Sequence, residues 1–158
     1  MPSKQTIQDL LTEEIKDLYS AEIQLTKALP KLAKGSNDPE LRSAFESHLT
    51  ETENQAARLE RAAVILGTTA KGKKCVGMEG CIKEGAEALE EDGAKGIHDL
   101  GLVGAATRVE HYEMAGYRTA INLAQRMGKD DIVELLEASF SEEQAADQKL
   151  RRIASSLM

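Results

Sequence analysis

The sequence predicts an all-α protein, an antiparallel four-helix bundle in which one long connection joins the second and third long helices. Composition is the first observation, because Ala, Leu, Glu and Lys are frequent and aromatic residues make up only 3% of the 158 residues. Val and Ile also never form the alternating runs that are typical of half-buried strands. Apolar residues instead recur at spacings of three and four along four long segments, as amphipathic helices require.

Glycine, proline and aspartate residues divide the chain into these segments. In the stretch KGSNDPE, Gly35 is expected to end the first helix, Asp38 to cap the second and Pro39 to begin it. Gly128 and Asp130 indicate a second stop and start, with Asp130 expected as the cap. The four long helices are therefore expected at 4–34, 38–66, 95–127 and 130–156.

The segment 68–94 is the long connection, and its periodicity predicts one short helix within it. The loops on either side of it in the chain are short, so the four long helices should form two antiparallel hairpins. A long crossover lets the chain travel the length of the bundle before the third long helix begins. We expect residues 1–158 to form a single domain.

Composition also narrows the choice of partners and location. The formal net charge of −7 disfavours nucleic acid and anionic membranes as partners. No apolar run approaches the ~18 residues of a membrane span, and the N-terminal stretch MPSKQTIQDL lacks the apolar core of a signal peptide. We therefore expect a cytoplasmic protein, a homodimer by the base rate for oligomers, with Cys75 and Cys81 as thiols rather than a disulfide.

Each expected long helix carries a row of core-facing residues that is apolar at both ends and polar in the middle. The rows comprise, helix by helix, Leu18, Glu22, Leu25, Leu29 and Leu32; Leu41, Phe45, His48, Thr52, Gln55 and Leu59, with Glu51 beside His48; Val103, Ala106, Glu110, Glu113 and Tyr117; and Leu136, Phe140, Glu143, Asp147, Leu150 and Ala154.

The acids of these rows are expected at matching heights. Glu22 and Glu51 are equally far from the middle of the first loop, and Glu113 and Glu143 differ by one residue about the loop between the last two helices. At ~1.5 Å of rise per residue, the partners within each hairpin differ by no more than about 1.5 Å in height. The sequence therefore predicts that carboxylates lie opposite carboxylates at one level of the bundle.

Glu110 and Asp147 are paired by the same reckoning, so up to six carboxylates would converge in an apolar interior. Buried like charges are costly unless some of the acids are protonated or cations neutralise them. No Lys or Arg occupies the rows, which favours a metal. Carboxylate oxygens with at most one imidazole, from His48, suit manganese or iron, with up to two ions per chain.

Four separated motifs resemble one known family. The stretches YSAEIQLTKALPKLAK, HLTETENQAARLER, RVEHYE and LEASFSEEQAADQKL, in this order, are similar to those of the YciE/YciF-like family of ferritin-like bacterial proteins linked to stress responses. The resemblance covers nearly the whole chain, including the KCVGMEG stretch of the crossover. It implies a ferritin-like fold, and the wider relatives rubrerythrin and ferritin bind two iron or manganese ions inside the bundle.

The resemblance also implies a set of ligands. Glu22 matches the ligand of the first helix, Glu51 that of the second and Glu143 that of the fourth. On the third helix Glu110 matches the usual ligand, and Glu113 is similar to the extra glutamate of rubrerythrin.

Two positions depart from the family pattern. The histidines expected three residues after Glu51 and Glu143 are replaced by Asn54 and Ala146. His48, one turn before Glu51, is a candidate substitute on the second helix, and Asp147 on the fourth. Weaker metal binding, a single ion and altered redox properties all stay open, and the resemblance alone does not imply oxidase activity.

Two functions follow from this reasoning. The first is a dinuclear iron or manganese carboxylate protein that handles oxygen or peroxide, or sequesters metal, during stress. The alternative is a non-enzymatic structural or interaction protein with a vestigial or weak metal site, which binds partners through an exposed row such as Leu10, Leu11 and Ile15. A ferritin-type storage cage is a third and weaker interpretation, because nothing in the sequence indicates the interfaces of a large shell.

Overall fold

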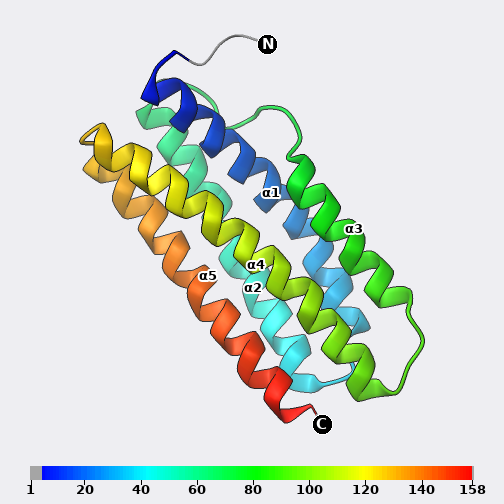
Figure 1. Cartoon of the computed structure of the whole chain (residues 1–158). Helices are drawn as coiled ribbons and strands as arrows, with labels where there is room; N and C mark the ends of the chain where they lie inside the picture. The colour runs from blue at the N-terminus through cyan, green and yellow to red at the C-terminus, as the bar shows by residue number, and fades with distance from the viewer. Residues whose placement is uncertain (1–4, 158) are drawn as a thin grey trace.

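Five helices and no strand make up residues 5–157, the part of the chain that the computed structural model describes (Figure 1). Four of them pack as an antiparallel bundle, and the fifth, α3, lies outside it against α1 and α4. The all-α prediction, with one long crossover that contains a short helix, is confirmed. The helices span Ile7–Gly35 (α1), Pro39–Ile65 (α2), Val76–Glu90 (α3), Lys95–Arg126 (α4) and Asp130–Ser156 (α5).

The first two helices begin at side-chain caps. Thr6 accepts a hydrogen bond from the backbone N–H of Asp9, whose carboxylate accepts one from the backbone N–H of Thr6 in return. The predicted start of this helix at residue 4 lies outside the described residues. Asp38 caps α2 as predicted, because its Oδ1 accepts from the N–H of Leu41 at 2.9 Å and Pro39 follows as the first helical residue.

Glycines with positive φ follow two of the long helices. Gly67 after α2 has φ +74° and Gly128 after α4 has φ +64°, in the left-handed region that a residue with a Cβ rarely adopts. The predicted cap of the last helix is wrong by one residue, since Lys129 occupies the N-cap position without a side-chain cap bond and Asp130 is already helical. Gly35 is likewise the last residue of α1 rather than the residue after it.

The crossover is fixed to the bundle by a buried polar cluster at the start of α3. Cys75 is fully buried at the N-cap, and its Sγ lies 3.2 Å from Asp17 Oδ2 and 3.0 Å from the Tyr112 hydroxyl. The Tyr112 hydroxyl also donates to Asp17 Oδ2 at 3.1 Å. Cys75 and Cys81 are both free thiols, as predicted, and burial raises the pKa of Cys75.

The apolar core consists of two separate clusters, one towards each end of the bundle. This arrangement confirms the rows that are apolar at both ends, and it contradicts the suggestion that Leu11 and Ile15 form an exposed row, since both are buried. One cluster includes Leu11, Ile15, Leu18, Leu59, Ala120, Ile132 and Leu136, and the other includes Leu25, Leu29, Leu41, Phe45, Leu102, Leu150 and Ile153.

Within residues 5–157, no helix is both long enough and apolar enough to cross a membrane.

The loop between α1 and α2 is held by a buried carboxylate from the second turn of α4. Asp99 is 1% exposed, and its Oδ1 accepts hydrogen bonds from the backbone and side-chain nitrogens of Asn37 at 3.0 and 3.2 Å. Its Oδ2 accepts from the backbone N–H of Asp38 at 2.7 Å. Asp99 therefore joins the two hairpins directly at this end of the bundle.

We expect Asp99→Ala to lower the free energy of unfolding by about 2–3 kcal/mol, because it leaves partly buried backbone N–H groups without an acceptor. Urea denaturation followed by circular dichroism measures this change. Asp92→Ala is the control, since Asp92 is exposed in the connection just before α4. Equal stability of the two variants would contradict the role given to Asp99.

Candidate metal centre

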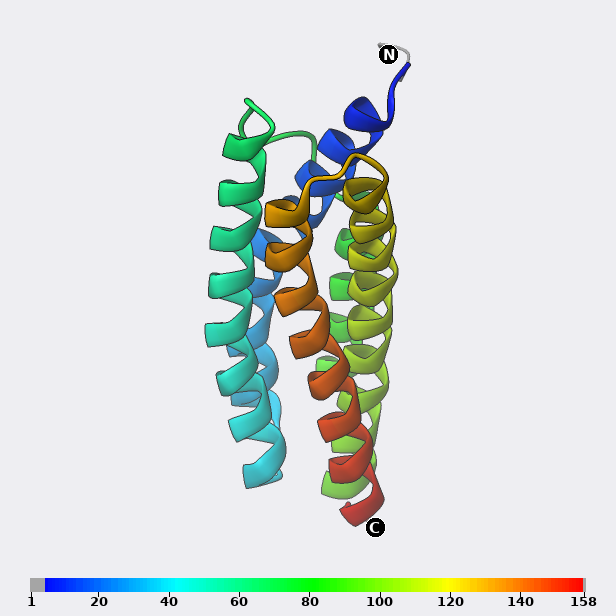
Figure 2. The same ribbon diagram turned by 90° about the vertical axis from the view of Figure 1, so that its left-hand side faces the viewer.

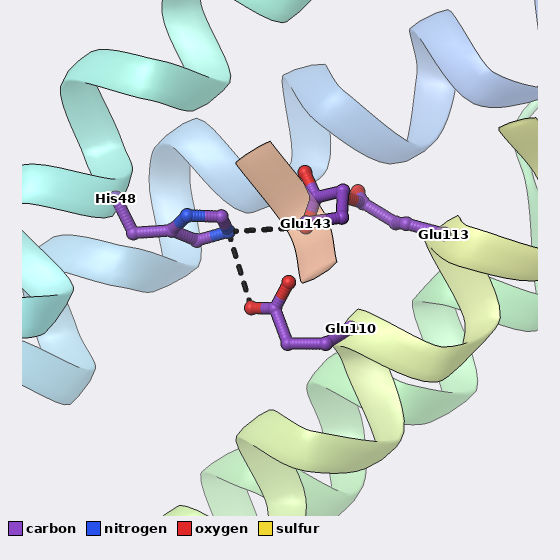
Figure 3. Close-up of side chains that lie close together, drawn as sticks. All are labelled: His48, Glu110, Glu113 and Glu143. Atoms are coloured by element: carbon purple, nitrogen blue, oxygen red, sulfur yellow. Dashed lines mark ion pairs between the residues drawn. The ribbon is translucent and has the colours of Figure 1, made fainter. Parts of the chain in front are cut away.

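Four donor side chains meet in the middle of the bundle, between the two apolar clusters. They are His48 of α2, Glu110 and Glu113 of α4, and Glu143 of α5, and one ligand atom from each lies within 4.8 Å of the others (Figure 3). Within residues 5–157 this is the one group of such side chains close enough to share a cation. Four of the seven predicted ligands are therefore brought together.

Helix geometry explains how these side chains come to share one level. Glu110 and Glu113 lie three residues apart, so both project from the buried face of α4. His48 lies on the buried row of α2, and Glu143 lies on that of α5. All four residues are at most 5% exposed.

The carboxylates of this group have too few partners. Both oxygens of Glu113 and both of Glu143 are buried without a hydrogen bond from any described residue. His48 Nε2 lies 3.1 Å from Glu110 Oε1 and 3.6 Å from Glu143 Oε2, but neither contact has the geometry of a hydrogen bond (Figure 3). Buried acceptors without donors are rare, and three carboxylates with one imidazole are a donor set that iron or manganese accepts. The residues present fit a divalent cation.

Burial and mutual repulsion shift the ionisation of this group. Burial, reinforced by the charge of Glu143, raises the pKa of Glu113 well above its usual range. Burial and the charge of Glu110 do the same to Glu143. Burial raises the pKa of Glu110, but the charge of protonated His48 and the other neighbouring groups together outweigh burial, and the pKa falls. Burial lowers the pKa of His48, but the carboxylates of Glu110, Glu51 and Glu143 together raise it by more, so His48 and Glu110 carry opposite charges.

Glu22 of α1 lies beside this group with one oxygen engaged. The Tyr117 hydroxyl donates to its Oε1 at 2.5 Å, while its Oε2 is buried without a partner. Burial raises the pKa of Glu22 to about 7, against the opposing effects of Tyr117 and of the charge of His48. Tyr117 of α4 thus reaches across to Glu22 of α1 rather than to Glu113, one turn away on its own helix.

Glu51 and Asp147, like Glu22, are predicted ligands that the structure does not bring into the four-donor group. The side chain of Glu51 is 40% exposed and pairs with His48 Nδ1 at 3.4 Å, on the outer side of the imidazole. Asp147 is buried, but its Oδ1 lies 3.2 Å from His111 Nε2 and its Oδ2 accepts from Arg151 Nη2 at 2.5 Å. Both acids are therefore engaged with partners outside the group.

Several polar residues near this level were missed or given no role by sequence reasoning. Arg151 lies one helical turn after Asp147, and this spacing, which often makes ion pairs, was the signal that could have revealed the contact. In the structure the side chain of Arg151 is 65% exposed, whereas that of Asp147 is buried. The buried atoms of Thr52 (Oγ1) and Gln55 (Oε1 and Nε2) also lack partners among the described residues. Their place in the polar middle of the row was the signal that could have singled them out.

The comparisons with known proteins identify the family of the chain. Residues 6–158 match the family described as Domain of unknown function (DUF892). The chain belongs to the DUF892 family. It is 40% identical over 150 residues to protein YciF of Escherichia coli strain K12, which covers 94% of this chain and 90% of that protein.

Two solved structures of relatives about 40% identical superpose closely on this chain. The crystal structure of the E. coli stress protein YciF matches with a TM-score of 0.94 at 39% identity, over 98% of each chain. YcfI of Rhodopseudomonas palustris, to which a structural role has been attributed, matches with a TM-score of 0.89 at 41% identity, over 93% of this chain and 94% of that one. The predicted YciE/YciF-like resemblance is confirmed.

A solved structure of low sequence identity shares the fold of this chain. A ferritin-like diiron-carboxylate protein from Bacillus anthracis strain Ames matches with a TM-score of 0.72 at 16% identity, over 96% of this chain and 99% of that one. The predicted ferritin-like architecture is therefore confirmed.

We expect the stability of the metal-free protein to fall as pH rises from about 5 to 8, as linkage requires for these pKa shifts. Glu22, Glu113 and Glu143 all have folded-state pKa values above the ordinary 4.5, so each favours folding most below pH 4.5. Their contribution is lost as pH rises towards and through the raised pKa values. Thermal melts in chelator at a series of pH values measure the trend.

Glu113→Gln should flatten this pH dependence and raise the melting temperature of the metal-free protein at pH 8, because it removes a buried charge that has no partner. Glu137→Gln, an exposed change on α5, is the matched control and should leave the profile unchanged. A Glu113→Gln protein that melts below the wild type at pH 8 would contradict the burial argument.

Proposed function

We propose that this chain is a ferritin-like carboxylate protein that holds iron or manganese inside the bundle, up to two ions per chain, and that it acts in a stress response. The observation that carries the proposal is the group of four buried donors within 4.8 Å, in which five of the six carboxylate oxygens have no hydrogen-bond partner among residues 5–157. A divalent cation would neutralise much of the charge that these side chains bring into the apolar interior.

Each side chain has a definite role in this proposal. His48, Glu110, Glu113 and Glu143 would hold one ion. The free oxygen of Glu22 would contribute to a second, with Tyr117 fixing the orientation of that carboxylate.

Glu51 and Asp147 stay predicted ligands, but each would first have to release its present partner. Glu51 would leave His48, and Asp147 would leave His111 and Arg151. Their participation is therefore expected to require a side-chain rearrangement.

Bound iron or manganese would supply Lewis acidity and a change of oxidation state, the two properties needed to handle oxygen or peroxide. The protein contributes the surroundings. The apolar clusters on either side exclude water from the carboxylates, which strengthens every electrostatic interaction among them.

The relatives support this proposal at two levels. The E. coli relative is described as a stress protein, which supports a role in stress, and the B. anthracis protein of the same fold is described as a diiron-carboxylate protein. Sequestration of metal and turnover of oxygen or peroxide are both compatible with one buried site. A homodimer and a cytoplasmic location stay predictions.

A structural or interaction role is the second candidate. One observation favours it, because the ion pairs of Asp147 with Arg151 and of His48 with Glu110 neutralise part of the site without metal. The structural role attributed to the R. palustris relative points the same way.

Metal content decides between these functions. We expect mass spectrometry to find about one to two iron or manganese ions per chain in untagged protein purified without chelator. The number of carboxylates available as ligands sets this range. Glu110→Ala should lose stoichiometric metal, while the exposed control Glu137→Gln should retain it.

Chelation provides an independent check, because a metal that binds only the folded state adds RT ln(1 + [L]/Kd) to stability. Removal of metal should therefore lower the melting temperature of the wild type but not that of Glu110→Ala. Wild-type protein that takes up no metal on reconstitution would refute the metal function and favour the structural role.

A further inference from the structure

A small cavity separates α2 from α5 at the level of the candidate metal centre. The two helices pack side by side in the bundle (Figure 2), and the cavity between them has a volume of about 80 Å³. Small side chains leave this space, namely Ala44 and Ser47 on α2 and Ala145 and Ala146 on α5. The other lining residues are Phe45, His48, Glu51, Glu110, Lys149 and Leu150.

The cavity connects buried donors with the surface. His48 and Glu110 form its inner end and are 5% and 3% exposed. Glu51, with a side chain that is 40% exposed, lies at its outer side together with the partly exposed Lys149. His48 stands between the two ends, with Nδ1 towards Glu51 and Nε2 towards Glu110 and Glu143.

We propose that this cavity is the route by which a hydrated divalent cation reaches the carboxylate group, and that Glu51 is the carboxylate that attracts the cation at its mouth. The inference rests on the proposed metal function. Glu51 lies outside the four-donor group, so the role assigned to it concerns the rate of metal uptake.

Size and charge both suit this role. A volume of about 80 Å³ holds two or three water molecules at ~30 Å³ each, so an arriving cation could keep part of its hydration shell. Each carboxylate along the way, Glu51 and then Glu110, can replace a lost water ligand. The negative charge of Glu51 attracts a cation to the mouth, where the ammonium of Lys149 opposes this attraction.

Other approaches to the group are less suitable for a cation. Between α4 and α5, the carboxylate of Asp147 is already engaged by the Arg151 guanidinium and by His111. Along the bundle axis, apolar clusters lie on both sides of the group. The cavity between α2 and α5 is the approach whose lining includes two of the buried donors, His48 and Glu110.

The test is stopped-flow measurement of Co²⁺ binding to chelator-treated protein, followed by the visible absorption of the bound ion, together with the equilibrium Kd. Ala146→Leu should fill the cavity and slow the association of Co²⁺ about tenfold or more. A close-packed interior leaves no void larger than a water molecule, so a hydrated ion could not pass. The Kd should change by much less, since association and dissociation use the same route. Ala138→Leu, at an exposed position two turns earlier on α5, is the matched control.

Glu51→Gln is the second variant, and it keeps an acceptor for His48 Nδ1 while removing the charge. It should slow association about three- to tenfold at low salt and weaken the salt dependence of the rate, as expected for lost electrostatic steering. Glu53→Gln, an exposed change on the same helix, is the control.

The outcomes separate this inference from the proposed function. Wild-type protein that binds no Co²⁺ at equilibrium would overturn both. Normal wild-type binding with unchanged association rates in folded Ala146→Leu and Glu51→Gln would overturn the route alone. Slower uptake in both variants, with a preserved Kd in Ala146→Leu and no change in either control, is the result that supports the route.

Discussion

The burial of like-charged carboxylates in the middle of a helical bundle is the constraint on which this structure depends. No residue from 5 to 157 donates a hydrogen bond to any of the four oxygens of Glu113 and Glu143, and an unpaired buried ion carries a penalty of several kcal/mol. The two apolar clusters above and below supply the stabilisation that offsets this penalty. Stability and site thus occupy different levels of the same four helices, which lets the polar level be poorly satisfied without loss of the fold.

Much of the architecture could be predicted from local signals in the sequence. Asp38 and Pro39 marked the start of α2 correctly, because capping depends on a few neighbouring residues. The spacing of apolar residues also identified Glu110, Glu113 and Glu143 as core-facing acids. Orientation is harder to predict, since a difference of one residue rotates a side chain by about 100° on a helix. That rotation separates the partly exposed Glu51 from the buried Thr52.

Partners from other helices account for what the sequence could not predict. Asp147 is buried as its spacing requires, yet Arg151 and His111 occupy its oxygens, and local spacing does not rank such ion pairs against a metal. Asp99 gave no signal at all, because its acceptors serve a loop about sixty residues earlier in the chain. A departure from the family pattern was informative instead. Ala146 stands where the pattern has a histidine, and the space beside this small residue belongs to a cavity that reaches the site.

The long crossover has a consequence for how the site is assembled. One hairpin supplies only His48 to the four-donor group, and the other supplies Glu110, Glu113 and Glu143. Each hairpin is closed by a short loop and can form from local contacts, whereas the two hairpins are joined in the chain by the long connection that contains α3. The four donors can meet only once the two hairpins have docked, so ligand binding at this group reports on completed assembly.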